Sequence, residues 1–138
     1  MSENYTKGIQ KILKYAKEEA IRLGQTYVGS EHLLLGVLKE ENCKASQLLG
    51  TLGCDFEEMR LLIKDMVKPS TGSMTMGHLP LTRRAERILR TTYSEAKKLG
   101  FDVADDTHLL LAISKEGEGL ASEVLLTFSI DYDLLYSY

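Results

Sequence analysis

The sequence predicts an all-α fold in which eight helices form two pseudo-symmetric four-helix repeats. Three observations lead to this prediction. The 138-residue sequence aligns with itself without a gap when it is shifted by 76 positions. Within each copy, apolar residues recur at intervals of three and four residues, which is the period of a helix with one buried face. No stretch shows the sustained alternation of apolar and polar residues that predicts a strand.

The two copies share residues along most of their length. Shared residues include Glu19-Ala20 and Glu95-Ala96, Leu23-Gly24 and Leu99-Gly100, His32 to Leu35 and His108 to Leu111, Lys39-Glu40 and Lys115-Glu116, Ala45-Ser46 and Ala121-Ser122, and Asp55 and Asp131. Self-similarity at a fixed spacing indicates one structural unit copied in tandem. We therefore predict a single domain over residues 1–138, with a first repeat at about 5–67, a linker at about 68–81 and a second repeat at about 82–138.

The first helix of each repeat is predicted from residue 6 to residue 23 and from residue 82 to residue 99. Its one-sided apolar positions are Ile9, Ile12, Leu13, Ala16, Ala20 and Leu23, with Ala85, Ile88, Leu89, Thr92, Ala96 and Leu99 as their counterparts. Thr6 and Thr82 stand where an N-cap hydroxyl accepts from the free N–H groups of the first turn. Gly24 and Gly100 stand where a helix ends in a left-handed residue.

The remaining three helices of each repeat follow in the same order. Ser30 and Asp106 are predicted caps of the second helix, which carries the His-Leu-Leu-Leu stretch. The third helix covers about 44–52 and 120–128, and the fourth follows Asp55 and Asp131. The second copy stops before the counterparts of three apolar residues of the first: Ile63, Met66 and Val67. This is compatible with a piece cut from a longer protein and equally with a naturally short last helix.

The segment at 68–81 divides the two copies. It holds both prolines of the chain, Pro69 and Pro80, together with Gly72, Gly77 and several Ser and Thr residues. This composition is typical of turns and loops, so we expect a connector without regular structure.

Composition and charge exclude several classes of protein. Hydrophobic residues make up 43% and charged residues 27%, which is an ordinary globular composition. With 17 basic and 20 acidic residues, the net charge of −3 offers no general attraction to nucleic acid or to an anionic membrane. The longest apolar runs fall far short of the roughly 20 residues of a membrane helix, and the amino-terminal residues do not resemble a signal peptide. Cys43 and Cys54 are expected as reduced thiols, which together with the lack of a signal peptide predicts a cytoplasmic protein. From the charge and the short apolar runs we predict that it binds neither nucleic acid nor membrane.

The sequence holds no motif for catalysis, for a cofactor or for a metal. It lacks the phosphate-binding loop of ATPases, and Gly117-Glu118-Gly119 starts a dinucleotide fingerprint that residue 122, a serine, does not complete. Neither His-Glu-x-x-His nor Cys-x-x-Cys occurs, which leaves metal binding without a motif. Ser30 and His32 stand two residues apart and do not face each other on a helix, so they predict no catalytic triad. We expect a chain that is not itself an enzyme.

Two features have a structural and a functional interpretation. His32 and His108 occupy equivalent positions, where a structural role at a helix start is favoured over a ligand or catalytic role. A basic cluster in the first helix of the second repeat is favoured as a solvated face over a nucleic-acid surface. Its members are Arg83, Arg84, Arg87 and Arg90.

Together, these residues resemble a known family. The stretch Val28-Gly-Ser-Glu-His-Leu-Leu-Leu-Gly-Val-Leu38 follows the Leu23-Gly24 helix end, and the second copy repeats it around His108. The pattern is similar to the amino-terminal repeat domain of Clp ATPases, closest to ClpC, over almost the whole chain. The resemblance implies eight helices in two four-helix repeats, placed ahead of two ATPase modules. It also implies a domain that docks protein substrates and adaptor proteins for the unfolding motor and its ClpP-type protease.

The resemblance leaves two functions open. The chain could be the docking domain of a ClpC-like unfoldase, or a stand-alone relative that sequesters or regulates Clp substrates or adaptors. Because the ATPase modules build the ring in this family, the isolated domain is expected to be a monomer.

The resemblance also implies a binding site. ClpC-type domains of some bacteria recognise phosphoarginine once in each repeat, and the matching residues are Thr6 and Glu31 in the first repeat and Thr82 and Thr107 in the second. A helix amino terminus with a cap hydroxyl suits the phosphate, and a carboxylate suits the guanidinium. Thr107 cannot neutralise a guanidinium, so we expect the second site to be weak or absent. The plainer interpretation makes Thr6 and Thr82 simple caps and Glu31 an acid favoured by the helix dipole.

Overall fold

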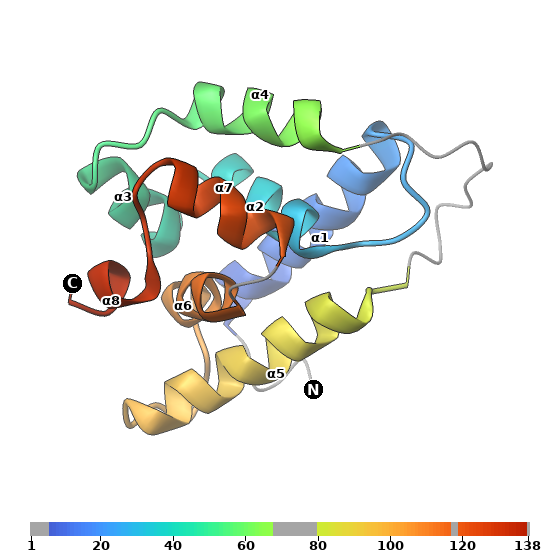
Figure 1. Cartoon of the computed structure of the whole chain (residues 1–138). Helices are drawn as coiled ribbons and strands as arrows, with labels where there is room; N and C mark the ends of the chain where they lie inside the picture. Colours follow the sequence, from blue (N-terminus) through green and yellow to red (C-terminus); the bar gives the residue numbers. More distant parts are fainter. Residues whose placement is uncertain (1–5, 68–79, 117–118, 138) are drawn as a thin grey trace.

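The computed structural model describes residues 6–67, 80–116 and 119–137 (Figure 1). Over these residues it contains eight α-helices and no strand, so the predicted all-α class is confirmed. The helices are α1 (Lys7–Arg22), α2 (Ser30–Lys39), α3 (Lys44–Thr51), α4 (Phe56–Met66), α5 (Arg83–Lys98), α6 (Asp106–Glu116), α7 (Leu120–Thr127) and α8 (Tyr132–Tyr136). The expected linker lies outside the described residues except for Pro80 and Leu81, and so do residues 117–118 of the incomplete dinucleotide fingerprint.

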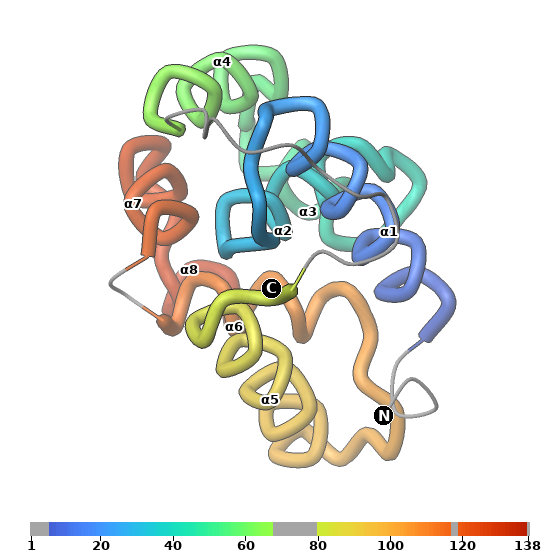
Figure 2. The backbone as a smooth tube through the Cα atoms, turned by 90° about the vertical axis from the view of Figure 1, so that its right-hand side faces the viewer, coloured from blue at the N-terminus to red at the C-terminus, as the bar shows by residue number. Residues whose placement is uncertain are grey.

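The second helix of each repeat, α2 or α6, lies at the centre of the molecule. Each packs on helices of both repeats: α2 touches α1, α3 and α4 as well as α5, α6 and α7, and α6 touches α5, α7 and α8 as well as α1, α2 and α3. The leucines of the two His-Leu-Leu-Leu stretches are buried on every side. Figure 2 shows that α4 of the first repeat lies beside α7 of the second, so the two repeats share one core.

The start of each repeat's first helix is hydrogen-bonded to the other repeat, although the helix itself packs mainly on the second helix of its own repeat. The N–H of Thr6, at the start of α1, donates to the carbonyl of Ala104 at 2.9 Å, and the N–H of Thr82, at the start of α5, donates to the carbonyl of Val28 at 2.9 Å. Val28 also forms an isolated parallel bridge with Leu81. Because residues 28 and 104 are equivalent, these are two copies of one contact related by the pseudo-symmetry of the duplication.

The predicted ends of α1 and α5 hold with one difference. Gly24 and Gly100 have φ angles of 72° and 88°, which is the left-handed conformation expected of them. The hydroxyl of Thr82 accepts from the N–H of Ala85 at 3.0 Å and caps α5. Thr6 occupies the same N-cap position, but its Oγ1 makes no cap hydrogen bond and is buried with no partner among the described residues.

The prediction that Ser30 and Asp106 are the N-caps of α2 and α6 is wrong. Ser30 and Asp106 are the first helical residues, and their side chains reach into the other repeat. Asp106 Oδ2 accepts from the N–H of Ala45 at 2.6 Å at the start of α3, and Ser30 Oγ accepts from the N–H of Ala121 at 3.5 Å at the start of α7. A side chain that satisfies a free N–H of another helix cannot be recognised from its position in its own helix.

The two equivalent histidines complete the caps of α2 and α6. His32 Nδ1 accepts from the N–H of Gly29 at 2.8 Å, and His108 Nδ1 accepts from the N–H of Asp105 at 2.9 Å. Histidine thereby takes the place of the Glu or Gln in a capping box. The structural role predicted for these residues is confirmed. The fourth helices also start as expected, with Asp55 and Asp131 accepting from N–H groups of the first turn.

The crossing of α1 and α2 depends on a residue without a side chain. A Cβ atom at Gly36 would lie 2.5 Å from the backbone carbonyl of Ile12, which cannot rotate away. We expect Gly36→Ala to lower the free energy of unfolding by about 1–3 kcal/mol, because the helices would have to separate. Gly50, in the exposed part of α3, has no atom within 4 Å of its Cβ position and serves as the control.

Urea unfolding of both variants measures this difference. Gly50→Ala is expected to be neutral or to stabilise by up to about 1 kcal/mol, since alanine is the better helix former. Equal free energies of unfolding for Gly36→Ala and the parent chain would contradict the close approach.

The cap of α2 makes stability depend on pH. Burial lowers the pKa of His32 below its ordinary value of 6.5, and the negative charge of Glu31 counteracts this only in part. The unfolded chain takes up a proton at the ordinary value while the folded chain resists it. Proton uptake by the unfolded chain therefore lowers the free energy of unfolding as the pH falls below about 6.5.

Denaturant unfolding measured between about pH 7.5 and pH 5, at steps of roughly half a pH unit, tests this expectation. In His32→Gln the amide oxygen keeps the acceptor for the N–H of Gly29 but does not titrate. Its free energy of unfolding should fall less steeply over this range than that of the parent chain. Identical slopes would show that His32 does not couple folding to protonation.

Candidate functional site

The amino-terminal end of α5 opens into a pocket of about 460 Å³ that both repeats build. The second repeat supplies Thr82, Arg83, Arg84, Arg87 and Leu120, and the first supplies Tyr27, Gly29, Ser30 and Glu31. The bridge between Val28 and Leu81 holds the two sides together. We call this the α5 pocket.

Two glycines make room for the charged side chains of the α5 pocket. A Cβ atom at Gly29 would lie 2.6 Å from Glu31 Oε1, so the carboxylate lies over this glycine and a larger residue there would displace it. A Cβ atom at Gly119 would lie 2.7 Å from Arg84 Cδ. The glycines therefore let a carboxylate and a guanidinium line the same pocket.

Two arginines of the α5 pocket are paired with Glu116, an acid that does not itself line the pocket. Glu116 Oε1 accepts from Arg87 Nη2 at 2.7 Å and from Arg84 Nε at 3.4 Å. The hydrogen bond from Arg87 is the main reason why the pKa of Glu116 lies below its ordinary value, although burial opposes this shift. Glu31 forms no ion pair with another described residue. The pocket thus combines an uncompensated carboxylate on one wall with arginines beside a helix amino terminus on the other.

The equivalent end of α1 opens into a second pocket of about 520 Å³ with different chemistry. Its lining residues are Thr6, Lys7, Gly8, Lys11, Glu40, Asn42, Cys43, Lys44, Asp105 and Asp106. We call this the α1 pocket. Gly8 stands where the α5 pocket has Arg84, and Asp105 stands where it has Gly29.

The acids of the α1 pocket are already engaged. Asp105 Oδ2 pairs with Lys44 Nζ at 3.5 Å, and Asp106 accepts from the start of α3. Burial acts to raise the pKa of Asp105, but hydrogen bonds from Thr107 and the proximity of His108 outweigh it and hold that pKa below its ordinary value. These carboxylates therefore hold the protein together, and the pocket offers lysines without a free carboxylate opposite them.

The four predicted site residues are distributed differently from the expectation. Glu31 lines the α5 pocket with Thr82, whereas Thr6 lines the α1 pocket, and the two pockets share no residue. This corrects the expected pairing of Thr6 with Glu31 within one repeat. The physical reason is the backbone hydrogen bond that ties the start of each first helix to the segment just before the second helix of the other repeat.

Thr107, the counterpart of Glu31, takes no part in the α1 pocket. Its hydroxyl donates to the carboxylate of Asp105, and its side chain lines a third, more apolar pocket with Phe101 and His108. Sequence reasoning missed Gly29 as part of the α5 pocket and Glu116 as the acid that pairs with two of its arginines. The sequence analysis identified the cluster of arginines. It could not place them near Glu31, because that proximity arises from packing between the two repeats.

Among the described helices, none has the length and apolar character needed to span a bilayer. A search of the same residues for three or more His, Cys, Asp or Glu side chains that could hold a metal ion found no such group.

Comparisons with known proteins place the chain in a family. Residues 4–128 match the family described as the Clp repeat (R) N-terminal domain. The chain is 34% identical over 131 residues to the chloroplastic chaperone protein ClpC1 of Arabidopsis thaliana, covering 95% of this chain and 14% of that protein. It is also 34% identical over 131 residues to the ATP-dependent Clp protease ATP-binding subunit ClpA homolog of Guillardia theta, covering 95% of this chain and 16% of that protein.

Solved structures agree in fold at lower identity. The N-terminal domain of ClpD from Arabidopsis thaliana superposes with a TM-score of 0.78 at 18% identity, covering 98% of this chain and 91% of that one. The N-domain of ClpV from Vibrio cholerae gives a TM-score of 0.81 at 13% identity, covering 98% and 82%. The chain spans about one-seventh of the length of the curated relatives it matches. On the match over residues 4–128 and this shared architecture, the chain belongs to the Clp repeat N-terminal domain family.

Proposed function

We propose that this chain docks protein substrates and adaptor proteins for a ClpC-like, ATP-dependent protein unfoldase that works with a ClpP-type protease in the cytoplasm. The proposal is supported by the family match and by the identity to ClpC and ClpA homologues. The sequence carries no ATPase or protease motif of its own, so hydrolysis and unfolding belong to other parts of such an assembly.

The α5 pocket is the proposed binding site, and its ligand is a phosphoarginine side chain. Free N–H groups and the positive dipole end of α5 attract a phosphate, and Arg83 and Arg84 add cationic charge beside it. Glu31 forms no ion pair with a described residue, so its carboxylate can pair with the guanidinium of the ligand. The single observation that carries the proposal is this placement of Glu31 opposite the start of α5.

The α1 pocket is proposed to bind phosphoarginine weakly or not at all. Asp105 and Asp106 bring negative charge next to Thr6, where the phosphate would lie, and Gly8 supplies no guanidinium in place of Arg84. Thr107 provides no carboxylate for the ligand. One strong site per chain is therefore the expected stoichiometry.

Calorimetry with free phosphoarginine tests the α5 pocket. We expect one binding event per chain, and Glu31→Ala should weaken it by about tenfold or more, because a charge-assisted contact to the guanidinium is lost. Glu123→Ala removes another first-turn glutamate, in α7, and should leave the affinity unchanged. Absence of binding heat with the parent chain, or unchanged affinity in Glu31→Ala, would refute the assignment.

A second site should require two changes in the second repeat. Glu31 lies over Gly29, but the equivalent of Gly29 is Asp105, whose carboxylate accepts from the backbone N–H and the hydroxyl of Thr107. We expect Thr107→Glu alone to leave one site, and Thr107→Glu combined with Asp105→Gly to yield two. Calorimetric stoichiometry measures this, and a second site in the single variant would contradict the argument from Gly29.

A further inference from the structure

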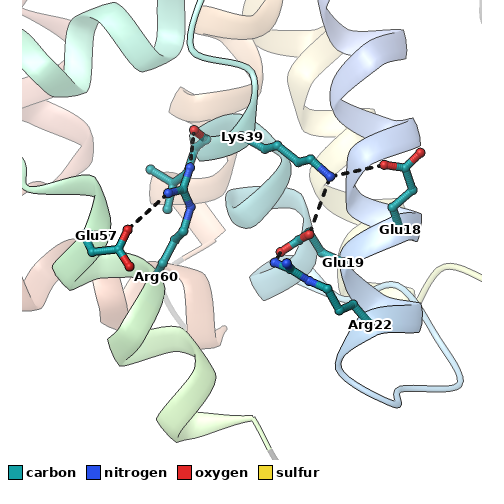
Figure 3. A network of polar contacts seen from close by, with 7 residues as sticks. Glu18, Glu19, Arg22, Lys39, Glu57 and Arg60 are labelled. Atoms are coloured by element: carbon teal, nitrogen blue, oxygen red, sulfur yellow. Dashed lines mark hydrogen bonds and ion pairs between the residues drawn. The ribbon is translucent and has the colours of Figure 1, made fainter.

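A third polar pocket, separate from the α5 and α1 pockets, lies between α1, α2 and α4. It is open, measures about 340 Å³ and is lined by Glu19, Arg22, Leu35, Lys39, Glu57, Arg60, Leu61 and Lys64. Figure 3 shows Glu19 and Arg22 on α1 and Glu57 and Arg60 on α4, with Lys39 extending towards Glu18 and Glu19. We call it the α4 pocket.

A buried carboxylate forms the floor of the α4 pocket. Glu19 is 5% exposed, and its Oε1 accepts from Arg22 Nη2 at 2.7 Å. Lys39 Nζ lies 3.8 Å from its Oε2 and donates to Glu18 at 3.3 Å. A carboxylate accepts more than one hydrogen bond per oxygen, so this one retains acceptor capacity towards the pocket.

The second repeat holds the same three charges and shows what they bind. Glu95, Lys98 and Lys115 are the counterparts of Glu19, Arg22 and Lys39, and Glu95 is 1% exposed. Tyr132 of α8 covers this group: its hydroxyl donates to Glu95 Oε1 at 2.5 Å. The ammonium groups of Lys98 and Lys115 lie 5.8 and 5.6 Å from the centre of its ring.

The first repeat does not supply the equivalent phenol. Phe56 stands in the position of Tyr132, has no hydroxyl, packs against the hydrophobic core and does not line the α4 pocket. Helix α4 is instead held over α2 and α7, with Arg60 Nη2 donating to the carbonyl of Leu38 at 3.1 Å. The charged group thus stays open to solvent beside Leu61, which is 52% exposed.

We propose that the α4 pocket binds a tyrosine side chain presented by a partner protein. The phenol hydroxyl donates to Glu19, as Tyr132 donates to Glu95. Arg22 lies against the ring, where a cation is attracted to the aromatic face, and Leu35 and Leu61 provide the apolar wall. Lys39 Nζ already lies 5.1 Å from the centre of the Tyr15 ring and keeps its contact with Glu19. This interaction surface goes beyond the docking of phosphoarginine and uses none of its residues.

Other side chains fit this group of charges less well. A lysine or arginine would meet Arg22, Lys39, Arg60 and Lys64, and an acidic or phosphorylated side chain would face Glu19 and Glu57. Phenylalanine would cover Glu19 without donating the additional hydrogen bond that a phenol supplies. Tyrosine supplies both the donor and the ring.

Titration of the 138-residue chain with N-acetyltyrosinamide, followed by backbone amide signals in NMR, tests the proposal. We expect saturable shifts at Glu19, Arg22, Lys39 and Leu61 with roughly millimolar affinity, since a single side chain makes few contacts. N-acetylphenylalaninamide should bind about tenfold more weakly, because it lacks the hydrogen bond to a charged acceptor. The O-phosphotyrosine amide should also bind more weakly.

Three variants assign the binding to this pocket. Glu19→Gln should weaken the tyrosine probe by about tenfold, through loss of the charged acceptor. Leu61→Asp, an exposed change that leaves the buried group intact, should weaken it several-fold. Leu126→Asp alters a leucine of α7 that is 55% exposed and lies outside the pocket, and should change nothing.

Several results would overturn the proposal. They are the absence of saturable shifts up to about 10 mM probe, shifts that map outside the α4 pocket, equal affinity for the phenylalanine probe, tighter binding of the phosphotyrosine probe, and unchanged affinity in Leu61→Asp. If Glu19→Gln does not fold, Leu61→Asp with its matched control still decides the outcome.

Discussion

Two backbone hydrogen bonds between the repeats determine where the α1 and α5 pockets lie. The N–H of Thr82 reaches the carbonyl of Val28, and the N–H of Thr6 reaches the carbonyl of Ala104. Each contact satisfies a backbone donor at a helix start, where no partner exists within the helix. It also fixes the start of one repeat's first helix against the second helix of the other. Both pockets at these helix starts are therefore interfaces between repeats.

A duplicated scaffold can still hold two different sites, because a few side chains at equivalent positions differ. Arg84 in one copy is Gly8 in the other, and Gly29 is matched by Asp105. In the second repeat, the carboxylate of Asp105 accepts from the first turn of α6 and binds Lys44, so it serves stability. In the first repeat the missing side chain leaves room for Glu31. The same fold position thus serves either the helix cap or the pocket.

The buried carboxylates of Glu19 on α1 and Glu95 on α5 also occupy equivalent positions but have different surroundings. Each lies almost wholly out of water, where an unpaired charge is costly, and each is held by two cations. Burial acts to raise the pKa of Glu95, but the hydroxyl of Tyr132 and the ammonium groups of Lys115 and Lys98 hold it below its ordinary value. The second repeat completes its group with its own tyrosine, whereas the first leaves its group facing the solvent.

Local signals in the sequence determined the helices, their order, the duplication and most of the helix ends. Periodic apolar residues, cap residues and left-handed glycines such as Gly24 act within a few residues of chain and can be recognised without coordinates. Tertiary structure alone decided that Glu31 belongs with Thr82, that Ser30 and Asp106 reach the helices of the other repeat, and that Phe56 leaves the α4 pocket open. These contacts join residues far apart in the chain, and their geometry depends on how the two copies pack, which no periodicity within one copy encodes.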